Sequence, residues 1–117
     1  MAAPNIVAVT TITGKTAVQA VTTTATAIVE NAADSGKVLK INALLIANIH
    51  ATNGGTISVE IYRNSTAYKI TNAITVPINS TLDALSKAIY LEEGDSLRLQ
   101  TGVDNVLEAV CSYEELS

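Results

Sequence analysis

Residues 86–100, SKAIYLEEGDSLRLQ, show most clearly the alternation of strand and turn residues that recurs along this chain. A short apolar segment leads into the acidic turn at residues 92–95, after which Leu97 and Leu99 alternate with polar residues. Alternation with a period of two is typical of a β-strand that buries one face. Gly94 can adopt the positive φ that a short hairpin loop needs. The segment therefore predicts a β-hairpin whose acidic loop lies in water.

The same succession of short apolar segments and turn residues recurs along the whole chain. Strand candidates lie at residues 5–12, 15–22, 25–30, 38–50, 56–63, 68–78, 86–91, 96–100 and 106–113. Turn signals about every ten residues are typical of all-β sandwiches. We therefore predict one domain over residues 1–117, an all-β, antiparallel β-sandwich, jelly-roll-like, with about eight or nine short strands. Residues 1–24 are rich in Ala and Thr, and they form either part of this sandwich or an extended N-terminal arm.

Residues 38–50, VLKINALLIANIH, are the longest apolar block. Every odd position from 39 to 49 is apolar, which predicts one long strand, or two strands broken by a bulge, with an odd-numbered buried face. A hairpin turn at residues 53–55 is expected to join it to the next strand. Leu44 and Ile46 then fall on the outer face, and Tyr62 falls on the outer face of the next strand. Such apolar side chains indicate either contact with another subunit or cover by a second element of the same chain. Leu44, Ile46 and Tyr62 are the predicted subunit contacts.

Composition limits the classes of function that fit this chain. Of its 117 residues 48% are hydrophobic, yet Trp and Phe are missing, so the core must be aliphatic. The net charge is −4 and the seven Lys and Arg are scattered, which argues against direct binding of nucleic acid. No apolar run approaches the roughly 20 residues of a membrane span, and the start lacks the charged region of a signal peptide. We therefore expect a protein made in a cytosol-like compartment that binds neither membranes nor nucleic acid.

Residues that could carry catalysis are few and isolated. The sequence GKT at residues 14–16 resembles the end of a phosphate-binding loop, but that motif needs a glycine where Val9 stands. His50 is the single histidine, so one chain can assemble neither a His-based metal cluster nor a serine triad. We expect it to be solvated or to lie at an interface. Cys111 lies on the apolar parity of its strand, which favours a buried thiol over a nucleophile. The sequence predicts a protein that is not an enzyme and has no cofactor.

Polar turns offer two further candidates for a site. Glu92, Glu93 and Asp95 could hold a hard cation, but they lack the regular spacing of a calcium loop, so a solvated turn is favoured. Asn64 and Asn79 begin sequences that match the glycosylation pattern. Without a signal peptide they are interpreted as polar turns, and no metal site is predicted.

Four segments carry a resemblance to a known group of proteins. They are GKVLKIN at residues 36–42, PINSTL at 77–82, IYLEEGDSL at 89–97 and SYEE at 112–115. Together they resemble small virion structural proteins of tailed double-stranded DNA bacteriophages, including phages of cyanobacteria and marine bacteria. The resemblance covers most of the chain from residue 36 onward, and its motifs are turns and strands rather than catalytic signatures.

The resemblance implies a β-sandwich that works as one copy in an assembly. Among the roles that the resemblance implies, we favour that of a capsid cement or decoration protein, which binds the major capsid protein or other virion proteins. It would be assembled in the host cytoplasm, lie in the virion, and form a homo-oligomer, with a trimer favoured. One alternative is a component of the tail, neck or fibre. Another is a glycan-binding sandwich that uses Tyr62 or Tyr68 and the polar loop at residues 64–66.

Overall fold

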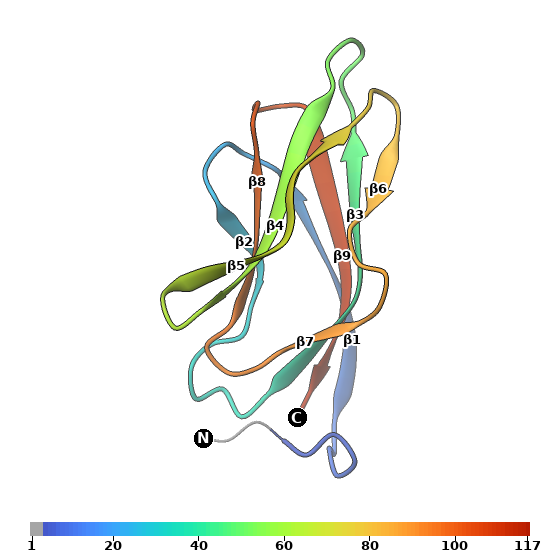
Figure 1. Cartoon of the computed structure of the whole chain (residues 1–117). Coiled ribbons are helices and arrows are strands. Elements are labelled where there is room, and N and C mark those ends of the chain that lie inside the picture. The colour runs from blue at the N-terminus through green and yellow to red at the C-terminus, as the bar shows by residue number, and fades with distance from the viewer. Residues whose placement is uncertain (1–3) are drawn as a thin grey trace.

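The computed structural model describes residues 4–117, which form nine strands and no helix. The strands are β1 (Ile12–Ala20), β2 (Thr26–Glu30), β3 (Val38–Asn48), β4 (Gly55–Arg63), β5 (Thr66–Val76), β6 (Thr81–Asp83), β7 (Ile89–Leu91), β8 (Ser96–Thr101) and β9 (Leu107–Leu116). They build two antiparallel sheets that pack face to face (Figure 1). The predicted β-sandwich is therefore confirmed. None of the described residues forms a helix long and apolar enough to cross a membrane.

The strand order identifies the sandwich as a jelly roll. The five-stranded sheet has the order β1-β9-β3-β6, with β7 also paired to β3, and the four-stranded sheet has the order β2-β8-β4-β5. Consecutive strands therefore occupy corresponding positions in opposite sheets, and the chain crosses between the sheets at most of its turns. Two Greek keys wound in this way define the jelly-roll topology. The sixth strand of the ideal eight-stranded form is split here into β6 and β7.

Two hairpins predicted from the sequence are absent from the structure, so both predictions are wrong. β7 and β8, on either side of the acidic turn, belong to different sheets, because β7 pairs with β3 whereas β8 pairs with β2 and β4. β3 and β4 likewise lie in different sheets. Each turn carries the chain across the core instead of folding it back within one sheet. β4 and β5 do form a hairpin, closed by Asn64 and Ser65, both at positive φ, as its short two-residue turn requires.

An irregularity at Asn42 reverses the burial pattern of β3. Ile41 pairs with Tyr113 and Ala43 pairs with Ser112, so Asn42 is an extra residue opposite β9. Because side chains alternate with a period of two, one inserted residue moves every later side chain to the other face. Leu44 and Ile46 are consequently fully buried, with 0% of each exposed. Their prediction as outward-facing subunit contacts is wrong, since both belong to the core.

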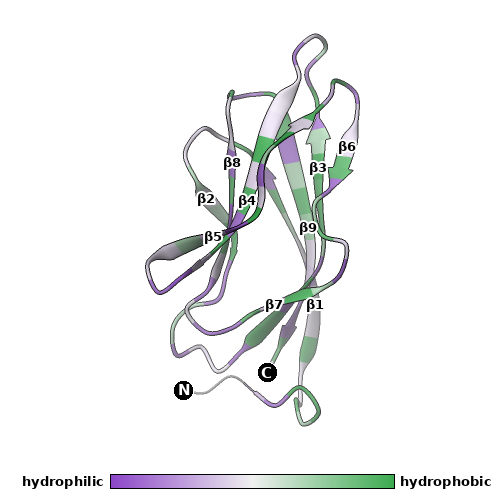
Figure 2. Ribbon diagram, viewed as in Figure 1, coloured by the Kyte–Doolittle hydropathy of each residue, from purple (hydrophilic) through white to green (hydrophobic). Residues whose placement is uncertain are grey.

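Aliphatic side chains from both sheets fill the space between them. Fully buried members include Ile41, Ile57, Leu91, Leu97 and Leu99. The alternation predicted in β8 and β9 is confirmed, since their apolar parity faces inward. The strands in Figure 2 carry bands of both hydrophobic and hydrophilic residues, as expected when each strand buries one face.

The N-terminal region departs from the sequence expectation. Of the strand candidate at residues 5–12, only Ile12 belongs to β1, and residues 5–11 form a turn and irregular backbone before it. Residues 13–14, which separate the first two strand candidates, lie inside β1. Residues 12–20 pair with β9 along their whole length, and so form part of the five-stranded sheet of this chain. Residues 1–3 of the suggested arm lie outside the described residues. Thr11 and Ser117 exchange two backbone hydrogen bonds, which places the start of β1 beside the C-terminus (Figure 1).

Candidate functional site

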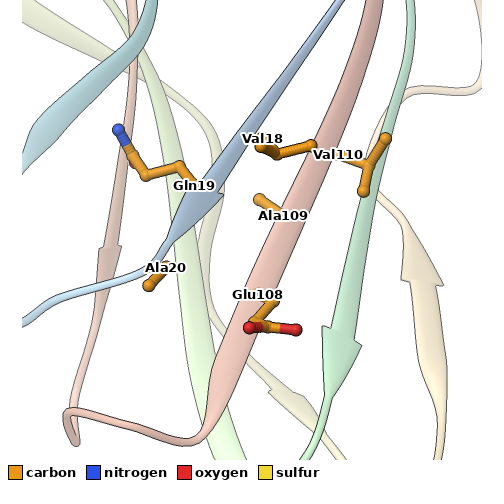
Figure 3. A pocket seen from close by; sticks show the side chains of 6 residues that line it. All are labelled: Val18, Gln19, Ala20, Glu108, Ala109 and Val110. Carbon is orange, nitrogen blue, oxygen red and sulfur yellow. The ribbon is translucent and has the colours of Figure 1, made fainter.

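An aliphatic row crosses the outer face of the five-stranded sheet. It consists of Val18 in β1, Val110 in β9 and Leu45 in β3, which are direct neighbours because Val110 pairs with both of the others. Their exposed fractions are 74% for Val18, 40% for Val110 and 40% for Leu45. Figure 3 shows Val18 and Val110 side by side, with Gln19 on the opposite side of β1. We call these three residues the aliphatic row.

The residues flanking the aliphatic row are small and mostly uncharged. On one side the next position across the three strands holds Thr16, Ser112 and Ala43, and on the other side it holds Ala20, Glu108 and Ala47. Beside Ala20 the surface is hollowed between the ends of β1 and β9 (Figure 3). A face with few charges and a central line of exposed apolar groups has the character of a protein contact surface.

The sequence contained a signal for this row. Val110 shares its strand parity with Glu108 and Ser112, so it is an apolar residue on a polar face. By the same criterion the sequence indicated Leu44 and Ile46, but after the irregularity at Asn42 it is Leu45 that faces outward. The pairing of Val110 with Val18 depends on long-range register, which a single sequence does not display.

The outer face of the four-stranded sheet is organised around the buried carboxylate of Glu60. Its side chain is hydrogen-bonded by Lys69 Nζ at 2.9 Å and by Arg98 Nε at 2.8 Å. Burial alone would raise the pKa of Glu60, but the bonds from the two cations outweigh it and hold that pKa below its usual value. The Arg98 guanidinium also lies 4.0 Å from the centroid of the Tyr62 ring. Tyr62 is half-buried on this face, and the cation covers one side of its ring.

The acidic turn is a structural clamp. Asp95 is buried, and both of its carboxylate oxygens accept hydrogen bonds from Arg63, at the end of β4. The backbone N–H of Glu92 also donates to Asp95, at 2.8 Å. Glu93 accepts the backbone N–H of Gly36 at 2.8 Å. The expectation that all these carboxylates lie in water is wrong for Asp95, because Arg63 draws it inward as the partner of an ion pair.

These contacts do not support the hypothesis that Glu92, Glu93 and Asp95 together hold a hard cation. Arg63 binds the carboxylates of both Glu92 and Asp95, and Glu93 bonds to Gly36, so all three carboxylates have partners within the protein. Among residues 4–117 no group of three or more His, Cys, Asp or Glu side chains is placed to hold a metal ion.

The single histidine and the single cysteine have structural roles. His50 Nδ1 accepts the backbone N–H groups of Thr52 and Asn53, at 3.1 and 3.0 Å, and so closes the β3–β4 loop. Cys111 is fully buried in the core, as predicted, and burial raises the pKa of its thiol to about 11. A thiol in this environment stays protonated at neutral pH and is a poor nucleophile.

The β4–β5 hairpin provides the exposed aromatic surface. Tyr68 is 59% exposed and borders a shallow hollow together with Ile61 and Arg63. Asn64 and Asn79, the two glycosylation-pattern residues, both lie in turns at positive φ. The interpretation of both sites as turns is confirmed.

Comparison of the chain with protein-family models and with curated proteins finds no match.

Proposed function

We propose that this chain is a structural protein of a tailed-bacteriophage particle, and that it acts as a cement protein on the outer surface of the capsid. Its partners would be the major capsid protein and further copies of itself, with a trimer as the favoured assembly. It would be made in the host cytoplasm and carried in the virion. It would act by binding rather than by catalysis.

The aliphatic row carries this proposal. Three exposed aliphatic side chains on a sheet, flanked mostly by small uncharged residues, form a surface that gains free energy when a partner removes it from water. A cement protein acts in this way, because it binds the assembled shell in preference to free subunits and so stabilises the shell by mass action.

Three further observations agree with the proposal. The resemblance of four segments to phage virion proteins is independent of the aliphatic row. The jelly roll is a common architecture of viral capsid proteins, although the fold alone does not determine a function. The net charge of −4 disfavours adhesion to packaged DNA.

Cryo-electron microscopy of the parent particle tests the proposal. We expect density for this chain over junctions between capsid proteins, with the aliphatic row facing the shell or a second copy. Density confined to the tail, neck or fibres would replace the cement role with the alternative virion role. Absence of the chain from purified particles would refute both.

A glycan-binding module is the second candidate, and Tyr68 favours it. Tyr62 has one ring face covered by Arg98, whereas Tyr68 is the more exposed of the two and borders a hollow into which a sugar ring could stack. Glycan-array binding lost in Tyr68→Ala and kept in Tyr90→Ala would support this function. Tyr90 is a suitable control because it is also exposed but lies on β7, in the other sheet. No binding by the unmodified protein at high concentration would refute it.

A further inference from the structure

The free edge of β1 offers unpaired backbone groups. Thr11 and Ser117 exchange both of their backbone hydrogen bonds, and Val21 N–H donates to Leu107. Antiparallel pairing alternates, so the odd-numbered residues of β1 bond to β9 while the even-numbered ones point away from it. The outward residues are Ile12, Gly14, Thr16, Val18 and Ala20. Within the described part of the chain, no group hydrogen-bonds to their backbone N–H or C=O.

The other sheet edges are protected against pairing. β2 is short, changes register between Ala27 and Val29, and its Ala27 carbonyl accepts the amide of Gln19. β5 changes register twice against β4, with Ala73 at positive φ. β6 and β7 have three residues each. Short length, bulges and blocking contacts are the usual means by which proteins prevent edge-to-edge association.

β1 has none of these protections. It runs for nine residues with an unbroken register against β9 and contains no proline. Its single charged residue is Lys15, whose Nζ forms an ion pair with Glu115 Oε2 at 2.9 Å. This charge is therefore neutralised within the sheet and does not repel an approaching strand. Among residues 4–117, β1 is therefore the one long and regular edge, and such an edge is a template for another strand.

We propose that β1 pairs with β1 of a second copy, antiparallel and about a two-fold axis at Thr16. The five-stranded sheets of two copies then form one continuous sheet. This register pairs the whole of β1: Ile12 lies opposite Ala20 of the second copy, and Ala20 lies opposite Ile12 of the second copy. It forms roughly ten inter-strand hydrogen bonds. The inference rests on the edge of β1 and does not depend on the proposed role in a phage particle.

Charge and shape both fit a second copy as the occupant. In this register Lys15 lies opposite Ala17 of the other copy, so no like charges meet, and β1 contains no acidic residue. The exposed Val18 lies opposite Gly14, where a Cβ atom would find nothing within 4 Å. The space that Gly14 leaves thus receives Val18 from the other copy. A two-fold axis repeats this contact on its other side.

The pairing also extends the aliphatic row. Val18 lies at the end of that row, next to the axis, so two copies place their rows on one shared sheet face. A two-fold contact produces pairs of molecules. A trimer would need a separate surface, and both contacts can exist in one assembly.

Cross-linking tests the register. Thr16→Cys places two thiols across the axis with Cα atoms about 5.5 Å apart, within the range of a disulfide. Val18→Cys is the matched control, because its two copies lie about 14 Å apart in this register and cannot be bridged. The buried Cys111 does not compete in either variant. We expect a disulfide-linked dimer from Thr16→Cys alone. A dimer from Val18→Cys instead would refute the register.

Two measurements on the isolated protein test the pairing itself. Sedimentation should show a reversible dimer, and hydrogen exchange should show Gly14, Thr16, Val18 and Ala20 amides protected only when the protein is concentrated. Thr16→Pro removes an outward N–H without touching the β9 pairing, and should raise the dimer dissociation constant at least about tenfold. A protein that stays monomeric, or one that associates with these amides still exchanging freely, would refute the proposal. Both results are independent of whether the chain is found on a phage.

Discussion

Replacing two adjacent leucines separately should give very different losses of stability. Leu44 is fully buried after the irregularity at Asn42, whereas Leu45 is 40% exposed on the aliphatic row. Leu→Ala removes three carbon groups, worth about 2.4 kcal/mol when they are fully buried. At Leu44 the cavity left behind adds to this, for a total of about 3–5 kcal/mol. At Leu45 the partial exposure reduces the loss to about 1.4 kcal/mol, and water fills the space.

Urea unfolding followed by far-ultraviolet circular dichroism measures this difference. We expect Leu44→Ala to be less stable than Leu45→Ala by about 2–3 kcal/mol, with similar denaturant dependence in both variants. Their midpoints of thermal unfolding should differ by about 10 °C in the same direction. Equal losses, or a larger loss in Leu45→Ala, would contradict the burial of the even positions of β3 that follow Asn42. The reasoning from the inserted residue would then be refuted.

Three further predictions concern the acidic clamp, two glycines and the thiol. The ion pair with Arg63 holds the pKa of Asp95 below its usual value despite burial, so its stabilisation is present above about pH 4 and disappears as the pH falls further. As the pH is lowered below about 4, the midpoint temperature of thermal unfolding should decrease, and it should decrease less steeply in Asp95→Asn. Gly55→Ala should cost about 1–3 kcal/mol in urea unfolding, because its Cβ would lie 2.9 Å from Val106, whereas Gly14→Ala should be neutral or slightly stabilising. The Cys111 thiol should react with a thiol reagent only after unfolding, and rapid reaction in the native protein would contradict its burial.

The clamp and the Glu60 cluster illustrate how charge is used in a protein with few charged residues. Asp95 and Glu60 are both buried and both paired with arginine: Glu60 bonds to Arg98, its partner within the β4–β8 pairing, and Asp95 bonds to Arg63 just beyond the Tyr62–Ser96 end of that pairing. Removing one member of such a pair leaves a buried charge without compensation, so these residues specify how β4 and β8 fit together. The sequence indicated no such role for either carboxylate.

Several features were predictable from local sequence. Alternation in β8 and β9 identified the buried residues of both strands, including Cys111, because side-chain parity along a regular strand depends on neighbours alone. Asn64 and Asn79 were identified as turns, since asparagine accepts positive φ readily. The strand candidate at residues 68–78 corresponds to β5, which stops at Val76, one residue before Pro77, because proline has no N–H to donate to a ladder.

The failures share a different origin. Residues 86–100 contain two strands and a tight turn, but nothing in that stretch specifies whether the strands bond to each other or to partners elsewhere. The answer lies in β3, which is far away in sequence and provides a better partner for β7. In the same way, the run ALLIA at residues 43–47 is apolar at every position, so either parity could face the core. Which parity is buried is determined by the register of β3 against β9, in which Asn42 is the extra residue.

The all-β class, the aliphatic core and the positions of most turns follow from the order of residues alone, because they depend on residue preferences over a few neighbours. The tertiary structure alone decided which sheet each strand joins, which face of β3 is buried, and which exposed aliphatic residues form one row. The physical reason is that backbone hydrogen bonding in sheets is satisfied between distant segments. Their register depends on the whole chain reaching its lowest free energy together.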